Sequence, residues 1–196
     1  MQFRKTWLLL TLGLLALASA VQAQPPKNEI EGDIGYYAPS DLKLPNTRVR
    51  YDSGISYGAR YGHRFNEMLG GDFSWSHFET DANHSDKDAL QCKSCDFTFE
   101  MFDFSLDWYP GGGNWALYGG VGWLTARFIL DSAHFHISDN NDNFTWHLGT
   151  AYTWMLGTNF YIRPDARIRF ISLHQQASGK YSSENEEFRV GLGWRF

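Results

Sequence analysis

The stretch Glu187-Phe-Arg-Val-Gly-Leu-Gly-Trp-Arg-Phe196, at the C-terminal end of the chain, alternates strictly between two kinds of residue. In an extended chain, residues i and i+2 point to the same side. One side of this stretch would then carry only apolar residues, namely Phe188, Val190, Leu192, Trp194 and Phe196. The other side would mix charges with glycine: Glu187, Arg189, Gly191, Gly193 and Arg195. The pattern predicts a β-strand that separates two opposite environments.

The same period of two recurs in seven earlier segments. They are residues 29–38, 55–65, 71–80, 102–108, 116–130, 144–156 and 160–173. No helical periodicity competes with them over a useful length. An even number of alternating segments of about ten residues is typical of bacterial membrane barrels. The sequence therefore predicts an all-β fold, an eight-stranded antiparallel up-and-down transmembrane β-barrel.

Two of these segments carry more detailed expectations. In residues 116–130 the pattern places Tyr118 and Leu124 on the apolar face and Trp123 and Arg127 on the polar one. In residues 160–173, Pro164 lacks the amide donor that a central strand needs, so we expect a local bulge there.

The connections between the segments alternate in length. Residues 66–70, 110–114 and 157–159 are short and rich in Gly, Asn and Pro, whereas the breaks at about 39–54, 80–96, 131–143 and 174–186 are long and polar. Short turns on one side and long loops on the other predict periplasmic turns and four extracellular loops. The rival fold is a soluble, lipocalin-like barrel with its apolar face inside, which would leave the many charged residues to cover its outside.

The first 23 residues read as a cleaved signal peptide. Arg4 and Lys5 precede an apolar run from Trp7 to Ala20, and Val21-Gln-Ala23 supplies small residues for cleavage. An uncleaved anchor is the alternative, although the run is shorter than a spanning helix. The predicted mature domain, residues 24–196, keeps 15 basic and 22 acidic residues, a formal net charge of −7. An acidic chain without a basic stripe argues against a nucleic-acid partner.

The polar faces of the predicted strands are rich in charge. They carry the acids Glu31, Asp33, Asp72, Asp103, Asp107, Asp165 and Glu187 and the arginines Arg60, Arg64, Arg127, Arg163, Arg167, Arg169, Arg189 and Arg195. Buried charges persist when they are paired, and the planar guanidinium of Arg binds carboxylates bidentately. Because eight strands leave an interior just wide enough for side chains, we expect a packed network of ion pairs inside the barrel. A narrow ion pathway lined by these charges is the alternative.

The leader, the eight alternating segments and the final Val190-Gly-Leu-Gly-Trp-Arg-Phe196 together resemble the small outer-membrane β-barrel proteins, such as the OmpA transmembrane domain and the OmpX and OmpW groups. The segment Arg163-Pro-Asp-Ala-Arg-Ile-Arg169 also resembles the penultimate strand of such barrels. The resemblance implies the cell outer membrane as the location, with lipid and lipopolysaccharide around a monomeric barrel. It also implies that Phe196 is a signal read by the outer-membrane assembly machinery.

The predicted second loop contains Cys92 and Cys95, the only two cysteines of the chain. In an exported protein we expect a small disulfide that stiffens the loop. A redox motif would need a helix N-terminus that is not predicted here. A metal site is the sharper alternative, formed with His84, Asp86 and Asp88 and joined by His134 or His136. We expect no cofactor.

For function, the sequence favours a structural or surface-interaction role through the extracellular loops. A narrow channel is the second candidate. A lipid A-modifying enzyme is the third, suggested by His134-Phe-His-Ile-Ser138 and by His174 and Ser178. We expect no enzyme activity, because the His-x-Ser-Asn pattern of lipid A deacylases is missing at His174.

Overall fold

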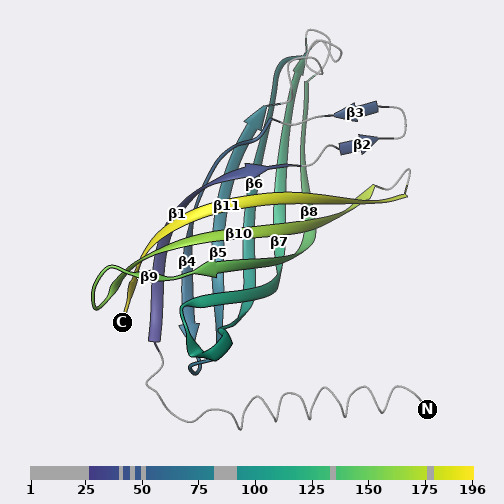
Figure 1. Ribbon diagram of the computed structural model, residues 1–196. Coiled ribbons are helices and arrows are strands. Elements are labelled where there is room, and N and C mark those ends of the chain that lie inside the picture. The colour runs from purple at the N-terminus through teal and green to yellow at the C-terminus, as the bar shows by residue number, and fades with distance from the viewer. Residues whose placement is uncertain are drawn as a thin grey trace, which may run out of the picture.

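The structure is a computed structural model that describes residues 27–39, 42–44, 47–49, 52–81, 92–132, 136–175 and 179–196 (Figure 1). Side chains are described for residues 28–39, 52–80, 98–127, 142–171 and 184–196. The predicted signal peptide, residues 1–23, lies outside the described residues, so its cleavage stays a prediction. No helix in the described part of the chain is long and apolar enough to span a membrane.

The described chain is almost entirely strand. Its strands are β1 (Lys27–Ala38), β2 (Leu42–Leu44), β3 (Thr47–Val49), β4 (Gly54–Arg64), β5 (Leu69–Asp81), β6 (Cys92–Trp108), β7 (Trp115–Ser132), β8 (His136–Tyr152), β9 (Trp154–Met155), β10 (Phe160–Gln175) and β11 (Gly179–Arg195). A single 3-10 turn, η1 (Pro110–Gly112), lies between β6 and β7. Strands β2 and β3 form a separate hairpin between β1 and β4.

The remaining strands close into one barrel. Each pairs antiparallel with its neighbours in the order β11-β1-β4-β5-β6-β7-β8-β10, and β10 pairs back to β11. Strand β9 continues β8 after a break at Thr153 and pairs with the same neighbour, β10. The first and last strands meet over ten residue pairs, from Glu29↔Arg195 to Ala38↔Glu186. The prediction of a closed eight-stranded up-and-down barrel is confirmed.

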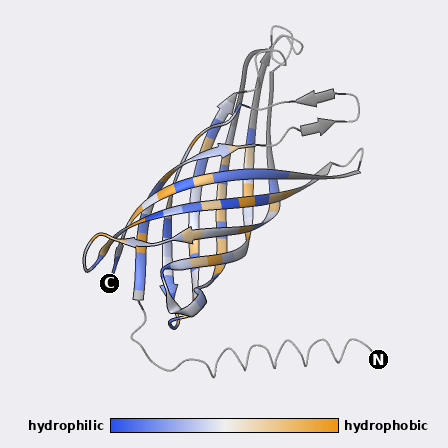
Figure 2. Ribbon diagram, in the orientation of Figure 1, coloured by the Kyte–Doolittle hydropathy of each residue, from blue (hydrophilic) through white to orange (hydrophobic). Residues whose placement is uncertain are grey.

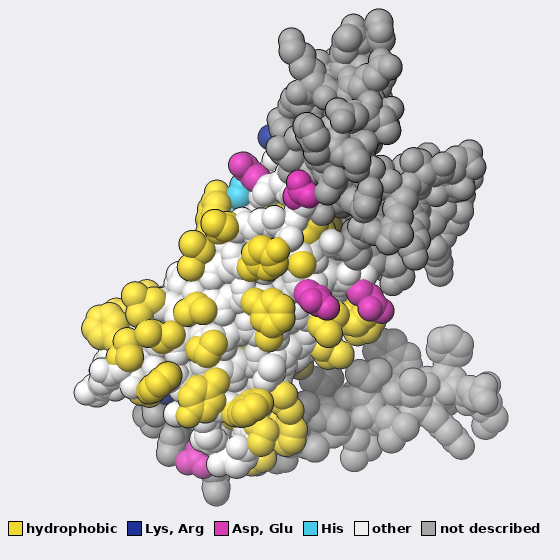
Figure 3. Space-filling model, turned by 45° about the horizontal axis from the view of Figure 1, so that its top comes forward, with side chains coloured by type: hydrophobic (Ala, Val, Ile, Leu, Met, Phe, Trp, Pro, Cys, Tyr) yellow, Lys and Arg dark blue, Asp and Glu magenta, His cyan; other side chains and the backbone are white. Residues whose placement is uncertain are grey.

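The strict alternation of the last strand is visible in its burial. Leu192 is 60% exposed on the outer wall, whereas Glu187 is fully buried inside. Figure 2 shows hydrophobic and hydrophilic residues alternating along β10 and β11. Figure 3 shows hydrophobic side chains spread over the outer wall of the barrel. The apolar faces therefore look outward, and the predicted inside-out arrangement holds for these strands.

The turns at one end are short, as predicted. They span residues 65–68, 109–114 and 156–159, and backbone hydrogen bonds such as Phe65 N–H to the Leu69 carbonyl, 2.9 Å, close them tightly. The start of β1 and the C-terminus lie at this same end (Figure 1). We call it the short-turn end.

At the opposite end, the prediction of a long loop is wrong in two of four places. Residues 131–143 and 174–186 are mostly strand, because β7 and β8 leave only residues 133–135 between them and β10 and β11 leave only 176–178. Both stretches are mostly polar, and a long polar stretch predicts a loop. Beyond a membrane, however, both faces of a strand meet water, so polarity does not end the strand.

The expected bulge at Pro164 is also absent. Pro164 pairs with Val190 in an unbroken register between β10 and β11. The missing amide is accommodated on the other side, where the neighbouring strand stops at Tyr152 and resumes at Trp154. The Thr153 N–H between them faces the other neighbour and donates to the Asn114 carbonyl at 2.9 Å, in register with the pairing of β7 and β8.

Candidate functional site

The interior of the barrel is the site where polar side chains concentrate. Near the short-turn end, one guanidinium organises the charges. Arg60 lies 3.2 Å from Glu29, 3.6 Å from Glu31, 3.2 Å from Asp72 and 3.5 Å from Asp107. Four strands (β1, β4, β5 and β6) thus contribute to a single cluster. Two further arginines, Arg64 and Arg195, are partly exposed and close the cluster toward the turns through Glu29.

A second cluster fills the middle of the barrel around Asp103. Its carboxylate accepts hydrogen bonds from Arg169 Nη1 and Nη2, both at 2.7 Å, and from Arg167 Nη1 at 2.8 Å. Glu187 lies behind the same two arginines, 3.8 Å from Arg167 and 3.6 Å from Arg169. The two hydrogen bonds from Arg169 to Asp103 are bidentate, which is the strong form of an arginine–carboxylate pair.

Asp165 links the two clusters. It lies 3.5 Å from Arg163 and 3.4 Å from Arg189, which in turn reach Glu31 and Asp33. The Tyr118 hydroxyl donates to both Asp165 oxygens at 2.8 Å and accepts from Arg167 Nε at 3.2 Å. The charges therefore form one connected network rather than isolated pairs.

Toward the opposite end several interior side chains are apolar, with the small polar Ser56 and Ser76 among them. Tyr37, Phe78 and Phe99 pack together, with ring centroids 4.7 Å apart for Tyr37 and Phe78 and 5.9 Å apart for Phe78 and Phe99. Met101, two residues from Phe99 on β6, and its partner Leu124 on β7 are also fully buried. We call these five residues the apolar plug. Sequence patterning hid most of the plug, because an apolar residue inside a barrel is indistinguishable from one outside it.

The structure places the sequence-predicted interior charges as follows. Those buried inside are Glu31, Asp33, Arg60, Asp72, Asp103, Asp107, Arg163, Asp165, Arg167, Arg169, Glu187 and Arg189, and those partly buried at the short-turn end are Arg64 and Arg195. Glu29 belongs to the network but was missed. The alternation did contain the signal, because Glu29 precedes Glu31 by two residues on the same face of β1.

The prediction for Arg127 is wrong, because its side chain is exposed on the outside of β7. The whole face assignment of this strand is reversed: Tyr118 and Leu124 are buried, whereas Trp123 is exposed. The cause is that the inner face of β7 carries no charged side chain among the described residues: Tyr118, Gly120, Gly122 and Leu124 lie on the inner side. Without a charge on either face near Trp123, hydrophobicity does not distinguish the inner face of this strand from the outer one.

Ser105, His147 and Asp103 form an arrangement that sequence reasoning did not anticipate. Ser105 Oγ lies 2.9 Å from His147 Nε2, and His147 Nδ1 lies 3.7 Å from Asp103 Oδ1. Strands β6 and β8 can share these contacts because β7, between them, carries Gly120 and Gly122. A Cβ on Gly120 would lie 2.8 Å from the His147 ring, and one on Gly122 would lie 2.9 Å from Thr145 Oγ1.

This order of groups is that of a serine hydrolase, but its surroundings are not. Ser105 and His147 are 0% exposed and Asp103 is 1% exposed. Asp103 is moreover committed to two arginines. A substrate cannot reach Ser105 in this packing, so the three residues extend the interior network.

Several predicted site residues cannot be placed by their side chains. Cys92 and Cys95 fall within strand β6, not in a loop as predicted, and their side chains lie outside the described residues. Also outside the described residues are the side chains of His84, Asp86, Asp88, His134, His136, Ser138, His174 and Ser178. Among the described residues, no group of three or more His, Cys, Asp or Glu side chains could hold a metal ion.

The chemistry available inside the barrel is therefore pairing. Within the described ranges the interior holds eight carboxylates and seven arginines, counting Arg64 and Arg195. Such a lining is nearly neutral and concentrates no single kind of ion. The guanidinium groups are held by carboxylates, and the geometry stabilises the barrel from within.

Comparison with known proteins agrees with this architecture. The family model described as "Outer membrane protein beta-barrel domain" matches residues 7–196. The sequence has no match among curated proteins.

Three solved structures illustrate the shared fold. Neisserial surface protein A is 15% identical (TM-score 0.55), with 86% of this chain and 97% of that chain covered. OprG from Pseudomonas aeruginosa is 18% identical (TM-score 0.56), with 87% and 95% covered. Ail, the attachment invasion locus protein of Yersinia pestis, is 19% identical (TM-score 0.52), with 86% and 99% covered. The family match spans nearly the whole chain and agrees with the closed barrel and its apolar outer wall. This chain therefore belongs to the outer membrane protein β-barrel domain family and is an integral protein of the outer membrane.

Proposed function

We propose that this protein is a closed, non-conducting barrel that acts at the cell surface through the strands that extend beyond the membrane. The observation that carries the first half is the filled interior. Arg163, Arg169 and Tyr161 are among the largest fully buried side chains in the described residues. An eight-stranded barrel has little room beyond its own side chains, and here those side chains are tied to one another.

The channel alternative has two obstacles in series. An ion that enters from the short-turn end would pass the Arg60 cluster and reach the Asp103–Arg167–Arg169 cluster, where Asp103 accepts hydrogen bonds from both arginines. It would then meet the apolar plug, in which Tyr37 and Phe78 are almost completely buried. A hydrophobic constriction excludes ions by excluding water. This arrangement supports a closed barrel.

The second half of the proposal rests on how far the strands continue. Among the side chains that the structure describes, the exposed aromatic residues of β6, β7 and β8 end at Phe102, Trp123 and Phe144. The strands themselves run on, paired with one another, to Cys92, Ser132 and His136. Figure 1 shows them rising as a tall sheet on one side of the barrel. We call this part of β6, β7 and β8 the sheet extension.

The sheet extension has a free edge. Strand β8 pairs with β10 only as far as Thr145↔Ile171, while β10 turns away with β11 as far as Gln175↔Gly179. Among the described residues, β8 from His136 to Phe144 therefore has no partner on its β10 side. A free edge presents unpaired backbone donors and acceptors, with which an extended segment of another protein can pair. This supports a contact role for the sheet extension.

The fold neighbours fit this role by name, since one is a surface protein and another an attachment invasion locus protein. An enzyme role has less support. The described Ser105–His147–Asp103 group is sealed inside the barrel, and the histidines suggested by the sequence lie outside the described side chains.

Conductance tests the closed interior. The purified protein is inserted into planar lipid bilayers and compared with an Arg167→Ala variant. We expect no stepwise current for the unchanged protein. A steady single-channel conductance that Arg167→Ala alters would overturn the closed-barrel proposal and favour the channel.

Trimming the extensions tests the surface role. One variant lacks residues 125–142 and joins Leu124 to Asn143, which are paired partners, through an Asn-Gly turn, so that most of the free edge of β8 is removed. A matched variant lacks residues 174–180 and joins Leu173 to Tyr181 in the same way. Cells that display each form are measured for retention on immobilised serum and extracellular-matrix proteins.

We expect the full chain to retain cells and the first trimmed variant to lose retention while its barrel stays folded. The second variant should keep most of it, because the free edge of β8 remains. Retention no greater than that of cells without the protein would contradict the surface role, as would equal retention by all three forms.

A further inference from the structure

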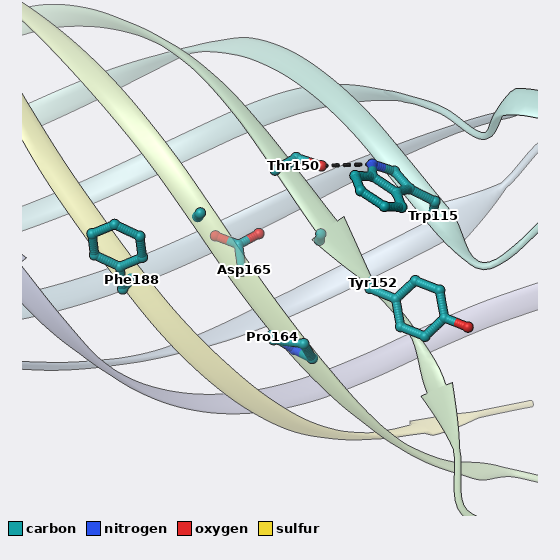
Figure 4. A pocket seen from close by; sticks show the side chains of 8 residues that line it. Trp115, Thr150, Tyr152, Pro164, Asp165 and Phe188 are labelled. Carbon is teal, nitrogen blue, oxygen red and sulfur yellow. Dashed lines mark hydrogen bonds between the residues drawn. The ribbon is translucent and has the colours of Figure 1, made fainter.

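The outer wall of the barrel is hollowed at Pro164. The hollow has a volume of about 280 Å³ and spans strands β7, β8, β10 and β11. Its lining consists of Trp115, Thr150, Ala151, Tyr152, Pro164, Asp165, Ala166 and Phe188. Figure 4 shows Trp115 and Tyr152 at one end of the hollow, Phe188 at the other and Pro164 between them. We propose that this hollow seats one acyl chain of a phospholipid in the periplasmic leaflet.

The strand register explains why small side chains come together at this part of the outer surface. Ala166 lies opposite Thr150 on one side and Phe188 on the other. In the next row toward the short turns, Trp115 lies opposite Tyr152. Small side chains thus form the floor, and three aromatic rings form the walls. Elsewhere on the lipid-facing surface the apolar positions are mostly filled by large side chains.

The backbone is also interrupted at the floor of the hollow. Asp165 lies opposite Ala151 and Ile162 opposite Trp154, so Pro164 lies opposite Tyr152. The Leu156 N–H donates to the Phe160 carbonyl, and alternate residues of a strand face the same neighbour, so Pro164 faces this strand as well. Proline has no amide hydrogen, and the Tyr152 carbonyl receives no ladder bond from it. The ladder between the two strands is therefore interrupted beside the hollow, where β8 ends at Tyr152 and β9 begins at Trp154.

The chemistry of the lining fits a hydrocarbon chain. Trp115, Tyr152 and Phe188 are each about half exposed, and in a membrane barrel the exposed wall faces lipid. The polar edge of Trp115 is satisfied internally, because its Nε1 donates to Thr150 Oγ1 at 2.7 Å. The Asp165 carboxylate is held inside the barrel by Tyr118, Arg189 and Arg163. No charge of the lining is left to bind a headgroup within the hollow.

The position of the hollow along the barrel indicates which membrane leaflet it faces. Trp115 is the first residue of β7, directly after the turn of residues 109–114. That turn belongs to the short-turn end, which the loop pattern predicts to face the periplasm. Tyr152 carries its hydroxyl away from the rest of the lining (Figure 4), as aromatic residues do at a membrane interface. An acyl chain would enter beside Tyr152 and lie across Thr150 and Ala166 toward Phe188.

The experiment uses the full-length barrel in vesicles of phosphatidylethanolamine and phosphatidylglycerol that contain a trace of phosphatidylethanolamine with a diazirine in one acyl chain. After illumination, crosslinked peptides are mapped by mass spectrometry. We expect crosslinks at residues 150–152 and 164–166 to exceed those at other lipid-facing peptides several-fold. Ala166→Phe fills the hollow and should remove this excess. Ala59→Phe adds the same ring to another exposed position, on β4, and should leave it unchanged.

Crosslinks spread evenly around the barrel would overturn the proposal, as would an excess that Ala166→Phe leaves intact. Folding of each variant is checked by its gel mobility before and after boiling. If Ala166→Phe does not fold, the smaller change Ala166→Leu takes its place. A dimer that an amine-reactive protein crosslinker captures in vesicles without the lipid probe, and that is lost in the Ala166 variant, would also refute it, since the hollow would then bind a second copy of the chain.

Discussion

Replacing Asp103 with Ala tests how much the interior network contributes to stability. Asp103 receives three hydrogen bonds of 2.8 Å or less from Arg167 and Arg169, all within the barrel. Removing one partner of a buried ion pair costs about 3–5 kcal/mol, because the remaining charge stays buried without compensation. Glu187 remains 3.6 Å from Arg169 and 3.8 Å from Arg167 and offsets part of that loss. We therefore expect a loss of unfolding free energy of about 3–4 kcal/mol.

The assay is equilibrium unfolding in urea, followed by tryptophan fluorescence of the barrel reconstituted in phospholipid vesicles. With a slope of about 2 kcal/mol per molar urea, the expected loss lowers the midpoint by about 2 M. Glu186→Ala is the matched control, because Glu186 is an exposed acid one residue from Glu187. Its effect should stay within about 0.5 kcal/mol.

A double-mutant cycle separates pairing from packing. In an Arg169→Met background, Asp103→Ala should cost less than in the unchanged protein, since one of the stranded charges is gone. The reasoning is refuted if Asp103→Ala alone stays within about 0.5 kcal/mol of the unchanged protein, or if the two substitutions are strictly additive.

Four other substitutions give three further tests. Arg60→Ala removes a partner that four carboxylates share and leaves Asp72 and Asp107 without the guanidinium they face, so it should cost about 3–5 kcal/mol in the same assay. Arg127→Ala on the outer wall should change little; equal effects would contradict the reversed face assignment of β7. Gly122→Ala places a methyl group against the Phe102 carbonyl and Thr145, 2.9 Å from each, and should destabilise the barrel by about 1–3 kcal/mol, while a neutral result would mean a looser interior. Phe196→Ala should lower the fraction of the protein assembled in the outer membrane, measured as the heat-shifted gel band per cell, and unchanged assembly would remove Phe196 as the signal.

The fold was readable from the sequence because two different solvents meet the two faces of each strand. From Glu187 to Arg195 in β11 every apolar residue faces outward and every charge faces inward, so the period of two predicted the strand and its two faces correctly. The short turns were equally clear, because Gly, Asn and Pro mark them.

The errors share one physical cause, which is that hydrophobicity reports the local surroundings and not the secondary structure. Beyond the membrane the polar continuation of β8 from His136 looks like a loop, although it is paired with β7. Inside the apolar plug, Leu124 looks like a lipid-facing residue, although it is buried. Neither the membrane boundary nor the plug can be recognised from the sequence of a single strand.

The contacts within the interior were beyond sequence reasoning for a geometric reason. Which inward residues meet depends on how far neighbouring strands are shifted along one another. The approach of His147 to Ser105 crosses an intervening strand, and it needs the space left by Gly120. Alternation names the inward residues, but only the register of all eight strands brings them together.

The most direct measurement of the central claim is the gel mobility of the protein from isolated outer membranes, with and without boiling in detergent. A closed barrel whose last strand pairs with its first stays compact in unboiled detergent, so we predict a band that shifts in mobility on heating. A protein recovered from the soluble periplasmic fraction, with one mobility before and after boiling, would contradict the account and reverse the inside and outside of every strand.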